Sequence, residues 1–142
     1  MPLSHDHVGF LIADVSRMMR LEFQRRIEHS AITLAQSRTL VYISRHEGIR
    51  QVDLAQLLEI QPITLARLID QLEAEGLVER RADPTDRRAY RIFQTPKADA
   101  RLAAIEDVGA SVREVALHGL SAEDREQLTA ILTRMRENLA AK

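Results

Sequence analysis

Residues 52–81 read VDLAQLLEIQPITLARLIDQLEAEGLVERR, and the spacing of their apolar side chains decides the fold. The apolar pattern of residues 51–58 predicts a helix of about two turns. Residues 59–61 form a short break. Pro62 suits the first position of a second helix, where its missing N–H costs nothing. The apolar residues of that second helix share one face: Leu65, Leu68, Ile69 and Leu72. This order predicts a helix-turn-helix.

Polar side chains gather on the first two turns of the second helix. Gln61, Thr64 and Arg67 cluster there, and Arg67 lies on the face opposite the apolar residues. A recognition helix reads base edges with its N-terminal residues. Arg67 would then pair with a guanine, and Gln61 with an adenine or a phosphate. The alternative for Arg67 is a contact with Asp70 or Gln71 on its own helix, worth only about 0.2–0.5 kcal/mol.

A hairpin is predicted directly after the second helix. Residues 77–81 and 89–93 are rich in β-forming side chains, and residues 82–88 (ADPTDRR) would form a long tip. Segment 77–97 carries six basic residues against three acidic ones, a net charge of +3, in a chain whose net charge is −1. This segment predicts a local anion-facing surface. The alternative is a solvated charged face, which is the usual fate of such a run.

The remaining segments predict a mainly α protein. Residues 8–28 have the spacing of an amphipathic helix, and Thr33 with Gln36 forms a capping box for the next one. After Pro96 the apolar residues 102–115 predict a long helix. A second capping box, Ser121 with Asp124, opens the last helix, whose apolar residues run from 128 to 139.

The segments VDLAQLL, PITLARLIDQLEAEGLVER and DPTDRRAYRIFQT resemble the MarR family of bacterial winged-helix regulators, and in particular its SlyA-like branch. The resemblance covers the whole chain as one domain, residues 1–142. It implies a mainly α fold with a small β-hairpin wing, built as a winged helix-turn-helix plus a helical dimerisation domain. Residues 33–95 would be the DNA-binding part, and residues 5–30 and 97–140 the dimerisation part.

The resemblance also implies a function. Members are homodimers that bind pseudo-palindromic operators, more often as repressors. The expected DNA-binding residues are Gln61, Pro62, Ile63, Thr64, Arg67, Asp86, Arg87 and Arg88. By position, Arg88 would enter the minor groove and Asp86 would orient it. Arg87 points the other way along the strand and suits a phosphate.

Two positions depart from the family pattern. Arg50 or Gln51 stands where the family usually has a Ser or Thr cap, so either the third helix is capped more weakly or a basic residue faces phosphate there. Gln94 stands where an apolar residue usually ends the second wing strand. The resemblance further implies that a small aromatic or anionic effector binds between the two parts and releases the DNA. The sequence does not name the residues of that pocket.

Other functions find little support in the sequence. The chain has no cysteine, which excludes disulfides, thiolate catalysis and a thiol redox switch. We expect no catalytic residues, no cofactor and no metal, although His5 and His7 lie close together near the N-terminus. No signal peptide or membrane span is visible, so we expect a cytoplasmic protein. The remaining alternative is a winged-helix module that binds a protein instead of DNA.

Overall fold

Residues 7–141, which the computed structural model describes, form six helices and three short strands. In chain order these are α1 (Val8–Arg26), α2 (Leu34–Arg45), β1 (Ile49–Arg50), α3 (Gln51–Leu58), α4 (Pro62–Ala74), β2 (Val78–Asp83), β3 (Asp86–Gln94), α5 (Ala98–Ala116) and α6 (Ala122–Ala140). The predicted fold class, mainly α with a hairpin wing, is confirmed.

Local capping sets where the helices begin. The Thr33 hydroxyl accepts from the N–H of Gln36, whose side chain accepts from the N–H of Thr33, so the predicted capping box of α2 is confirmed. The second capping box, at the start of α6, is confirmed as well. Pro62 is the first residue of α4, as predicted. Arg50 precedes α3 and makes no side-chain capping bond, which confirms the weaker cap.

The sheet differs from the prediction in two respects. The expected long tip, residues 82–88, is wrong. Strand β2 extends as far as Asp83, and strand β3 begins at Asp86. Only Pro84 and Thr85 connect the two strands. Backbone pairing between the two strands therefore keeps charged residues in β structure, although their intrinsic strand propensity is low. The short strand β1 was not predicted. It pairs antiparallel with β3 and gives the strand order β1-β3-β2.

The hydrophobic core lies within the helix-turn-helix and its sheet. It joins α2, α3, α4, both wing strands and the first half of α5, through Leu40, Ile43, Leu54, Ala55, Leu58, Leu65, Ile69, Leu72, Leu77, Val78, Ile92, Ala98 and Ile105. In contrast, neither α1 nor α6 contains a buried residue.

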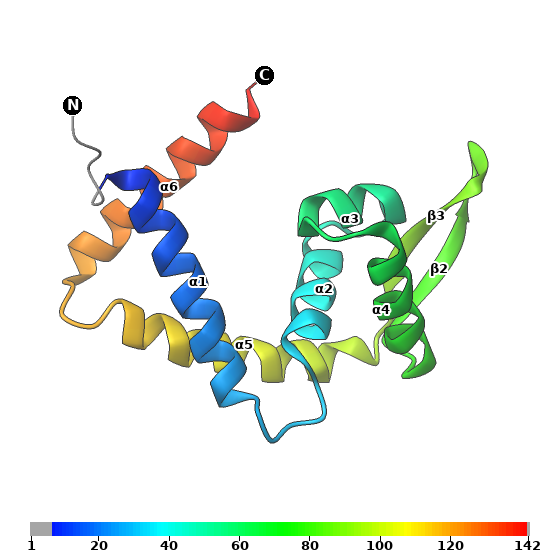
Figure 1. Ribbon diagram of the computed structural model, residues 1–142, viewed down its shortest axis with the longest axis horizontal. Coiled ribbons are helices and arrows are strands. Elements are labelled where there is room, and N and C mark those ends of the chain that lie inside the picture. The colour runs from blue at the N-terminus through cyan, green and yellow to red at the C-terminus, as the bar shows by residue number, and fades with distance from the viewer. Residues whose placement is uncertain (1–6, 142) are drawn as a thin grey trace.

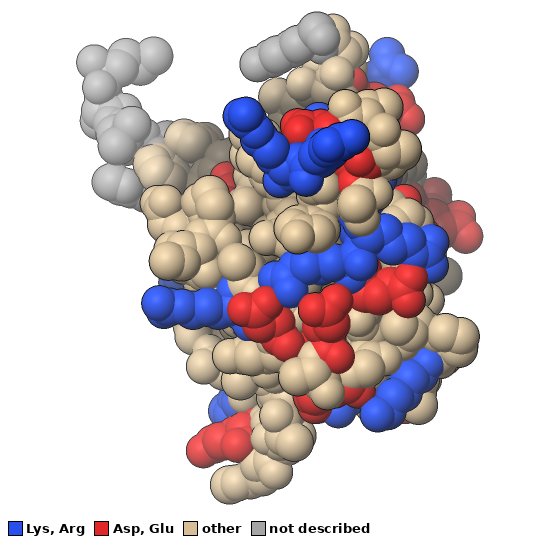
Figure 2. Space-filling model, turned by 90° about the vertical axis from the view of Figure 1, so that its right-hand side faces the viewer, with Lys and Arg blue, Asp and Glu red and all other residues tan. Residues whose placement is uncertain are grey.

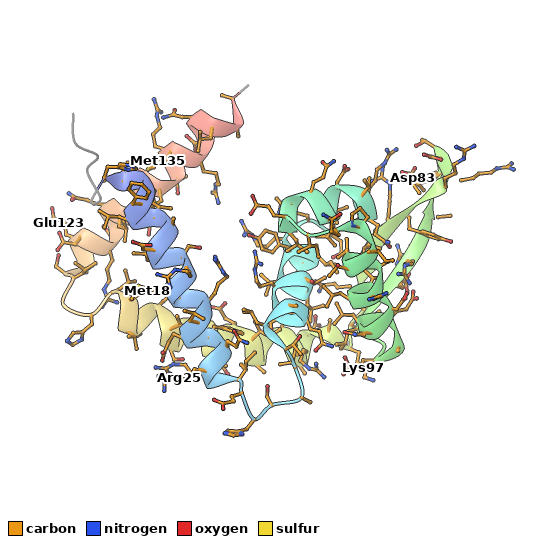
Figure 3. All side chains as sticks on the ribbon, in the orientation of Figure 1. Met18, Arg25, Asp83, Lys97, Glu123 and Met135 are labelled. Carbon is orange, nitrogen blue, oxygen red and sulfur yellow. The ribbon has the colours of Figure 1, made fainter. Side chains whose placement is uncertain are left out.

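The molecule has two arms joined by α5 (Figure 1). One arm holds α1 and α6, and the other holds α2, α3, α4 and the wing, whose tip projects away from the helices. Figure 3 shows Asp83 near that tip and Lys97 at the base of the hairpin. The described part of the chain includes no helix with the length and apolar character needed to cross a membrane.

Candidate nucleic-acid interface

The turn between α3 and α4 aims the N-terminal end of α4 outward. Glu59 follows α3 in the left-handed region, with φ 56°, and ends that helix. A residue other than glycine adopts this conformation at some cost. Apolar residues from both helices share one core, and their packing offsets that cost. The two helices therefore pack into one core and leave the first turn of α4 exposed.

The five residues expected to contact DNA on α4 and at its N-cap are all exposed: Gln61, Pro62, Ile63, Thr64 and Arg67. Ile63 has 65% of its surface exposed. Arg67 makes no ion pair or hydrogen bond to any other residue within 7–141. Its alternative partners are engaged elsewhere, because Asp70 pairs with Arg80 at 2.7 Å and Gln71 accepts from Gln36 at 3.0 Å. The structure therefore leaves the Arg67 guanidinium available.

Arg80 was counted with the anion-facing residues, and this was wrong. Its guanidinium turns inward and joins α3, α4 and the wing. It donates to the Gln51 side chain at 3.0 Å and to the Ala66 carbonyl at 3.0 Å. It also pairs with Asp70 at 2.7 Å and Glu73 at 3.2 Å. A guanidinium with this many partners holds the wing against the recognition helix instead of binding an external anion.

Two more arginines of the wing are also engaged within the protein. Arg81 pairs with Glu79 and stacks over the ring of Phe93, 3.9 Å from its centroid. Arg91 donates to the Gly48 carbonyl at 3.0 Å. Basic side chains accordingly lie beside acidic ones on the wing side of the molecule (Figure 2). Fewer arginines of segment 77–97 are therefore free to bind an anion than its net charge suggested.

Arg87 and Arg88 are exposed on β3, and within residues 7–141 their guanidinium groups bind no other side chain. The expected side-chain contact between Asp86 and Arg88 does not form. The Asp86 carboxylate instead accepts from the backbone N–H of Arg88 at 3.0 Å. Asp86 therefore shapes the backbone after the turn and leaves the guanidinium of Arg88 free.

Asp83, the last residue of β2, is buried despite its place beside the tip. Its Oδ1 accepts from the N–H of Thr85 at 2.9 Å and from the Thr85 hydroxyl at 2.8 Å. Its Oδ2 lies 2.8 Å from Arg50 Nε and 3.4 Å from Arg91 Nε. These bonds from Thr85, followed by the two guanidinium groups, hold the pKa of the Asp83 carboxyl below its usual value. Asp83 is therefore charged at neutral pH.

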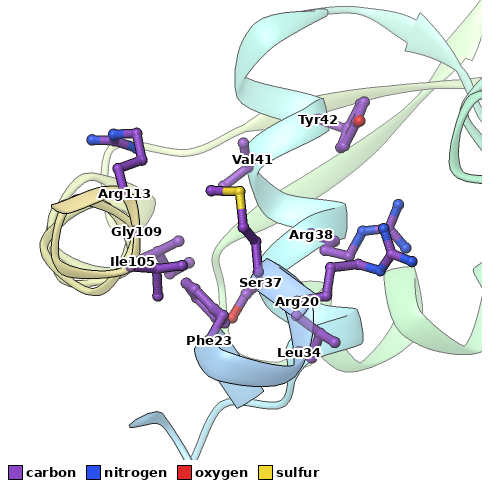
Figure 4. Close-up of a pocket in the computed structure, with 12 residues that line it drawn as sticks. Arg20, Phe23, Leu34, Ser37, Arg38, Val41, Tyr42, Ile105, Gly109 and Arg113 are labelled. Carbon is purple, nitrogen blue, oxygen red and sulfur yellow. The ribbon is translucent and has the colours of Figure 1, made fainter. Parts of the chain in front are cut away.

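A cavity of about 300 Å³ lies between α1, α2 and α5 (Figure 4). Its lining is mostly apolar, with three arginines at its edge. The lining residues are Met19, Arg20, Phe23, Leu34, Ser37, Arg38, Val41, Tyr42, Ile105, Gly109, Val112 and Arg113. Arg20 donates to the Ser16 hydroxyl and Arg113 pairs with Glu106, whereas Arg38 has no partner within the described chain. The cavity could hold a small apolar molecule that carries a negative charge.

The histidines form no metal site within the described residues, where no three His, Asp or Glu side chains are placed to share an ion. His5 lies outside the described residues. His7 has another role, because its Nδ1 accepts from the N–H groups of Gly9 and Phe10 and caps α1.

Comparison with known proteins identifies the family. A MarR family model matches residues 32–90, which include the helix-turn-helix and most of the wing. The structure of a MarR transcriptional regulator from Methanosarcina mazei Go1 is 30% identical over 94% of this chain and 96% of its own, with a TM-score of 0.80. The chain belongs to the MarR family.

Two further structures agree with this assignment. The transcriptional regulator PA3341 is 39% identical to this MarR-family chain over 96% of it and 100% of its own length, with a TM-score of 0.77. The transcriptional regulator SlyA is 29% identical over 92% of each chain, with a TM-score of 0.71. The SlyA likeness agrees with the SlyA-like branch that the sequence indicated.

Proposed function

We propose that this chain is a sequence-specific DNA-binding transcriptional regulator, a repressor, that acts as a homodimer on a pseudo-palindromic operator. One observation carries the proposal. Arg67, Arg87 and Arg88 lie on the recognition helix and the wing without a partner in the described chain, while Arg80, Arg81 and Arg91 nearby are engaged within the protein. Free guanidinium groups on these two elements suit base edges and phosphates.

In this proposal α4 enters the major groove. Arg67 donates to O6 and N7 of a guanine, and the exposed Ile63 contacts a thymine methyl group. Gln61 binds an adenine or a phosphate, beside Pro62 and Thr64. Two copies of α4 would occupy successive major grooves about 34 Å apart, so the operator should be an inverted repeat.

Binding to DNA can be tested directly. The purified chain is incubated with its own upstream DNA and with random-sequence DNA in a gel-shift assay. Selective retention of an inverted repeat is the expected result. If no sequence is preferred under any salt condition, the alternative of a protein-binding winged-helix module replaces the proposal.

The wing would reach the flanking minor groove, with Arg88 inserted and Arg87 on a phosphate. Narrow A/T-rich grooves concentrate negative potential and favour such an arginine. Arg88→Ala should weaken operator binding and reduce the slope of log affinity against log salt by roughly one charge per arginine lost. A salt titration followed by fluorescence anisotropy measures that slope.

Arg81→Ala is the matched control for Arg88→Ala. It removes an arginine of the same hairpin whose guanidinium already pairs with Glu79 and stacks on Phe93. The salt slope of this variant should stay close to that of the wild type. Equal slopes for the wild type and Arg88→Ala would contradict the wing assignment.

The dimerisation part would comprise residues 5–30 and 97–140, and the DNA-binding part residues 33–95. The absence of buried residues on α1 and α6 supports this division. Both helices expose large apolar side chains, including Val15 on α1 and Ile131 on α6, which are 50% and 57% exposed. A surface of this kind indicates a partner. A second copy of the chain would cover it.

An effector would bind in the cavity between α1, α2 and α5, because this cavity adjoins both parts. Its apolar lining and the unpaired Arg38 suit a small aromatic or apolar anion. Such a ligand must bind more tightly to the protein form that cannot span the operator, since otherwise it would release no DNA.

Filling the cavity should uncouple the effector from DNA. A Cβ atom added at Gly109 would have one neighbour within 4 Å, Nη1 of Arg113 at 3.5 Å, so the backbone tolerates a side chain there. Gly109→Leu should keep operator affinity within about threefold, since no residue of α4 or the wing lines the cavity, and should abolish release by a benzoate-class anion that releases the wild type. Gly109→Ala, which leaves most of the cavity open, is the control. Isothermal calorimetry and gel-shift titration give the two readouts. If Gly109→Leu still responds, the effector binds elsewhere.

A further inference from the structure

We propose that Asp83 and Arg50 form a clamp that holds the hairpin tip against the start of α3 and thereby positions Arg87 and Arg88 for DNA. This inference rests on the proposed function. Neither residue would itself touch DNA in this role, so both are positioning residues.

The first argument is the burial of Asp83. The Asp83 side chain is 0% exposed, although Asp83 directly precedes the two-residue turn at the tip of the hairpin. A buried carboxylate is costly unless charge and hydrogen bonds compensate for it. Thr85 provides two hydrogen bonds, and Arg50 and Arg91 provide the charge. Both hydrogen bonds go to Oδ1, while the buried Oδ2 accepts no hydrogen bond within the described residues and is compensated by the two nearby guanidinium groups, which favours an ionised acid at this position.

The second argument is the position of Arg50. This residue occupies the N-cap of α3, where a side-chain oxygen would normally accept from the helix backbone. Its guanidinium reaches the tip instead. Nε lies 2.8 Å from Asp83 Oδ2, and Nη2 donates to the Thr85 hydroxyl at 3.3 Å. Arg50 thus joins two segments more than 30 residues apart in the sequence.

The third argument is the location of the clamp relative to the free arginines. Asp83 of β2 lies opposite Asp86 of β3 in the backbone register of the hairpin. Arg87 and Arg88 are the next two residues of β3. The hairpin projects from the helices (Figure 1), so a contact near its tip limits its swing more than contacts at its base do. A wing held before DNA arrives loses less conformational entropy on binding.

The sign of one substitution separates the clamp from simple electrostatics. Asp83→Asn keeps the shape of the side chain and removes a negative charge close to the DNA surface. Electrostatics alone predicts tighter binding. The clamp predicts weaker binding, by about tenfold, because the ion pairs with Arg50 and Arg91 are lost. Asp53→Asn, the same change at an exposed acid of α3, is the matched control and should leave affinity unchanged or slightly raised.

A second background tests whether the effect passes through the wing arginines. In Arg87→Ala/Arg88→Ala, the clamp has nothing left to position, so adding Asp83→Asn should cost less than about twofold, because the affected contacts are no longer independent. An undiminished loss there overturns the proposal, as does unchanged or tighter binding of Asp83→Asn alone. Circular dichroism melts confirm that each variant is folded.

Arg50→Lys provides an independent variant in case Asp83→Asn fails to fold. A lysine keeps the positive charge but cannot reproduce the guanidinium contacts with Asp83 and Thr85. If the clamp exists, Arg50→Lys lowers operator affinity in the wild-type background. In the Arg87→Ala/Arg88→Ala background, Arg50→Lys causes no further loss. Retained affinity indicates that Arg50 is a plain phosphate contact, which contradicts the clamp.

A spin label separates failure of the clamp from failure of the proposed function. The chain has no cysteine, so Arg87→Cys provides a single labelling site. Without DNA, Asp83→Asn should sharpen the electron paramagnetic resonance spectrum of that label, because the tip moves more freely. An unchanged spectrum overturns the clamp. A sharpened spectrum of the labelled variant, together with a wild-type protein that binds no operator, supports the clamp and refutes the DNA-binding proposal.

Discussion

Ile131→Glu is expected to dissociate the homodimer and to reduce operator affinity by more than about 100-fold. Ile131 is 57% exposed on α6, a helix without any buried residue. The single interface of the dimer would then hold two unpaired carboxylates, one from each protomer, and each uncompensated buried charge costs about 3–5 kcal/mol. A monomer contacts one half-site and loses the joint binding of two. Sedimentation velocity and gel-shift assays measure the two effects.

The controls for this prediction lie on α1 and α6. Val15→Glu changes an exposed apolar residue of α1 and should have the same effect. Glu137→Lys reverses a charge on the opposite side of α6, nine residues or about two and a half turns from Leu128, and should leave the dimer intact. A dimeric Ile131→Glu protein would show that another surface forms the interface.

Arg67→Ala is expected to have the second largest effect. A bidentate contact with guanine contributes about 1–3 kcal/mol of discrimination, and a dimer makes this contact in each half-site. The two contacts together amount to at least about 2 kcal/mol, so the expected loss on the intact operator is at least about 30-fold. It should be much smaller on an operator whose contacted guanine has been replaced, because both changes remove the same contact. Anisotropy titrations on a set of single-base operator variants identify that position.

Gln71→Ala serves as the control for Arg67→Ala. Gln71 lies one turn further along α4, where its side chain accepts from Gln36. Its loss should alter stability slightly without changing base preference. If Arg67→Ala lowers affinity equally on every operator variant, Arg67 is a phosphate contact and the base-reading proposal is wrong.

Much of the fold could be predicted from the sequence because its signals are local. The capping pairs Thr33–Gln36 and Ser121–Asp124 each lie within one helical turn, and both form as predicted. Residues 51–58 and Pro62 define the boundaries of α3 and α4 in the same way. The order of helix-turn-helix and hairpin follows from these elements, and the family was indicated by the resemblance of the motifs that they carry.

The wing geometry was less predictable. Strand β1 has two residues, too few for a periodic signal, and it exists because β3 pairs with it. The strands run through charged residues up to a two-residue connection because ladder pairing outweighs propensity there. Asp86 binds the backbone of Arg88 and not its guanidinium, which strand alternation alone did not indicate.

The sequence by itself determined the helices, their caps and the positions of the arginines, since hydrophobic periodicity and capping act over a few residues. Only the tertiary structure decided which arginines remain free. Arg80 reaches Gln51 and Arg91 reaches the Gly48 carbonyl, 29 and 43 residues away, while Arg67 and Arg88 meet no partner in the described chain. The sequence shows the same guanidinium group at each of these positions. Whether it supports the fold or faces DNA depends on the acids and carbonyls that distant segments bring within about 3 Å.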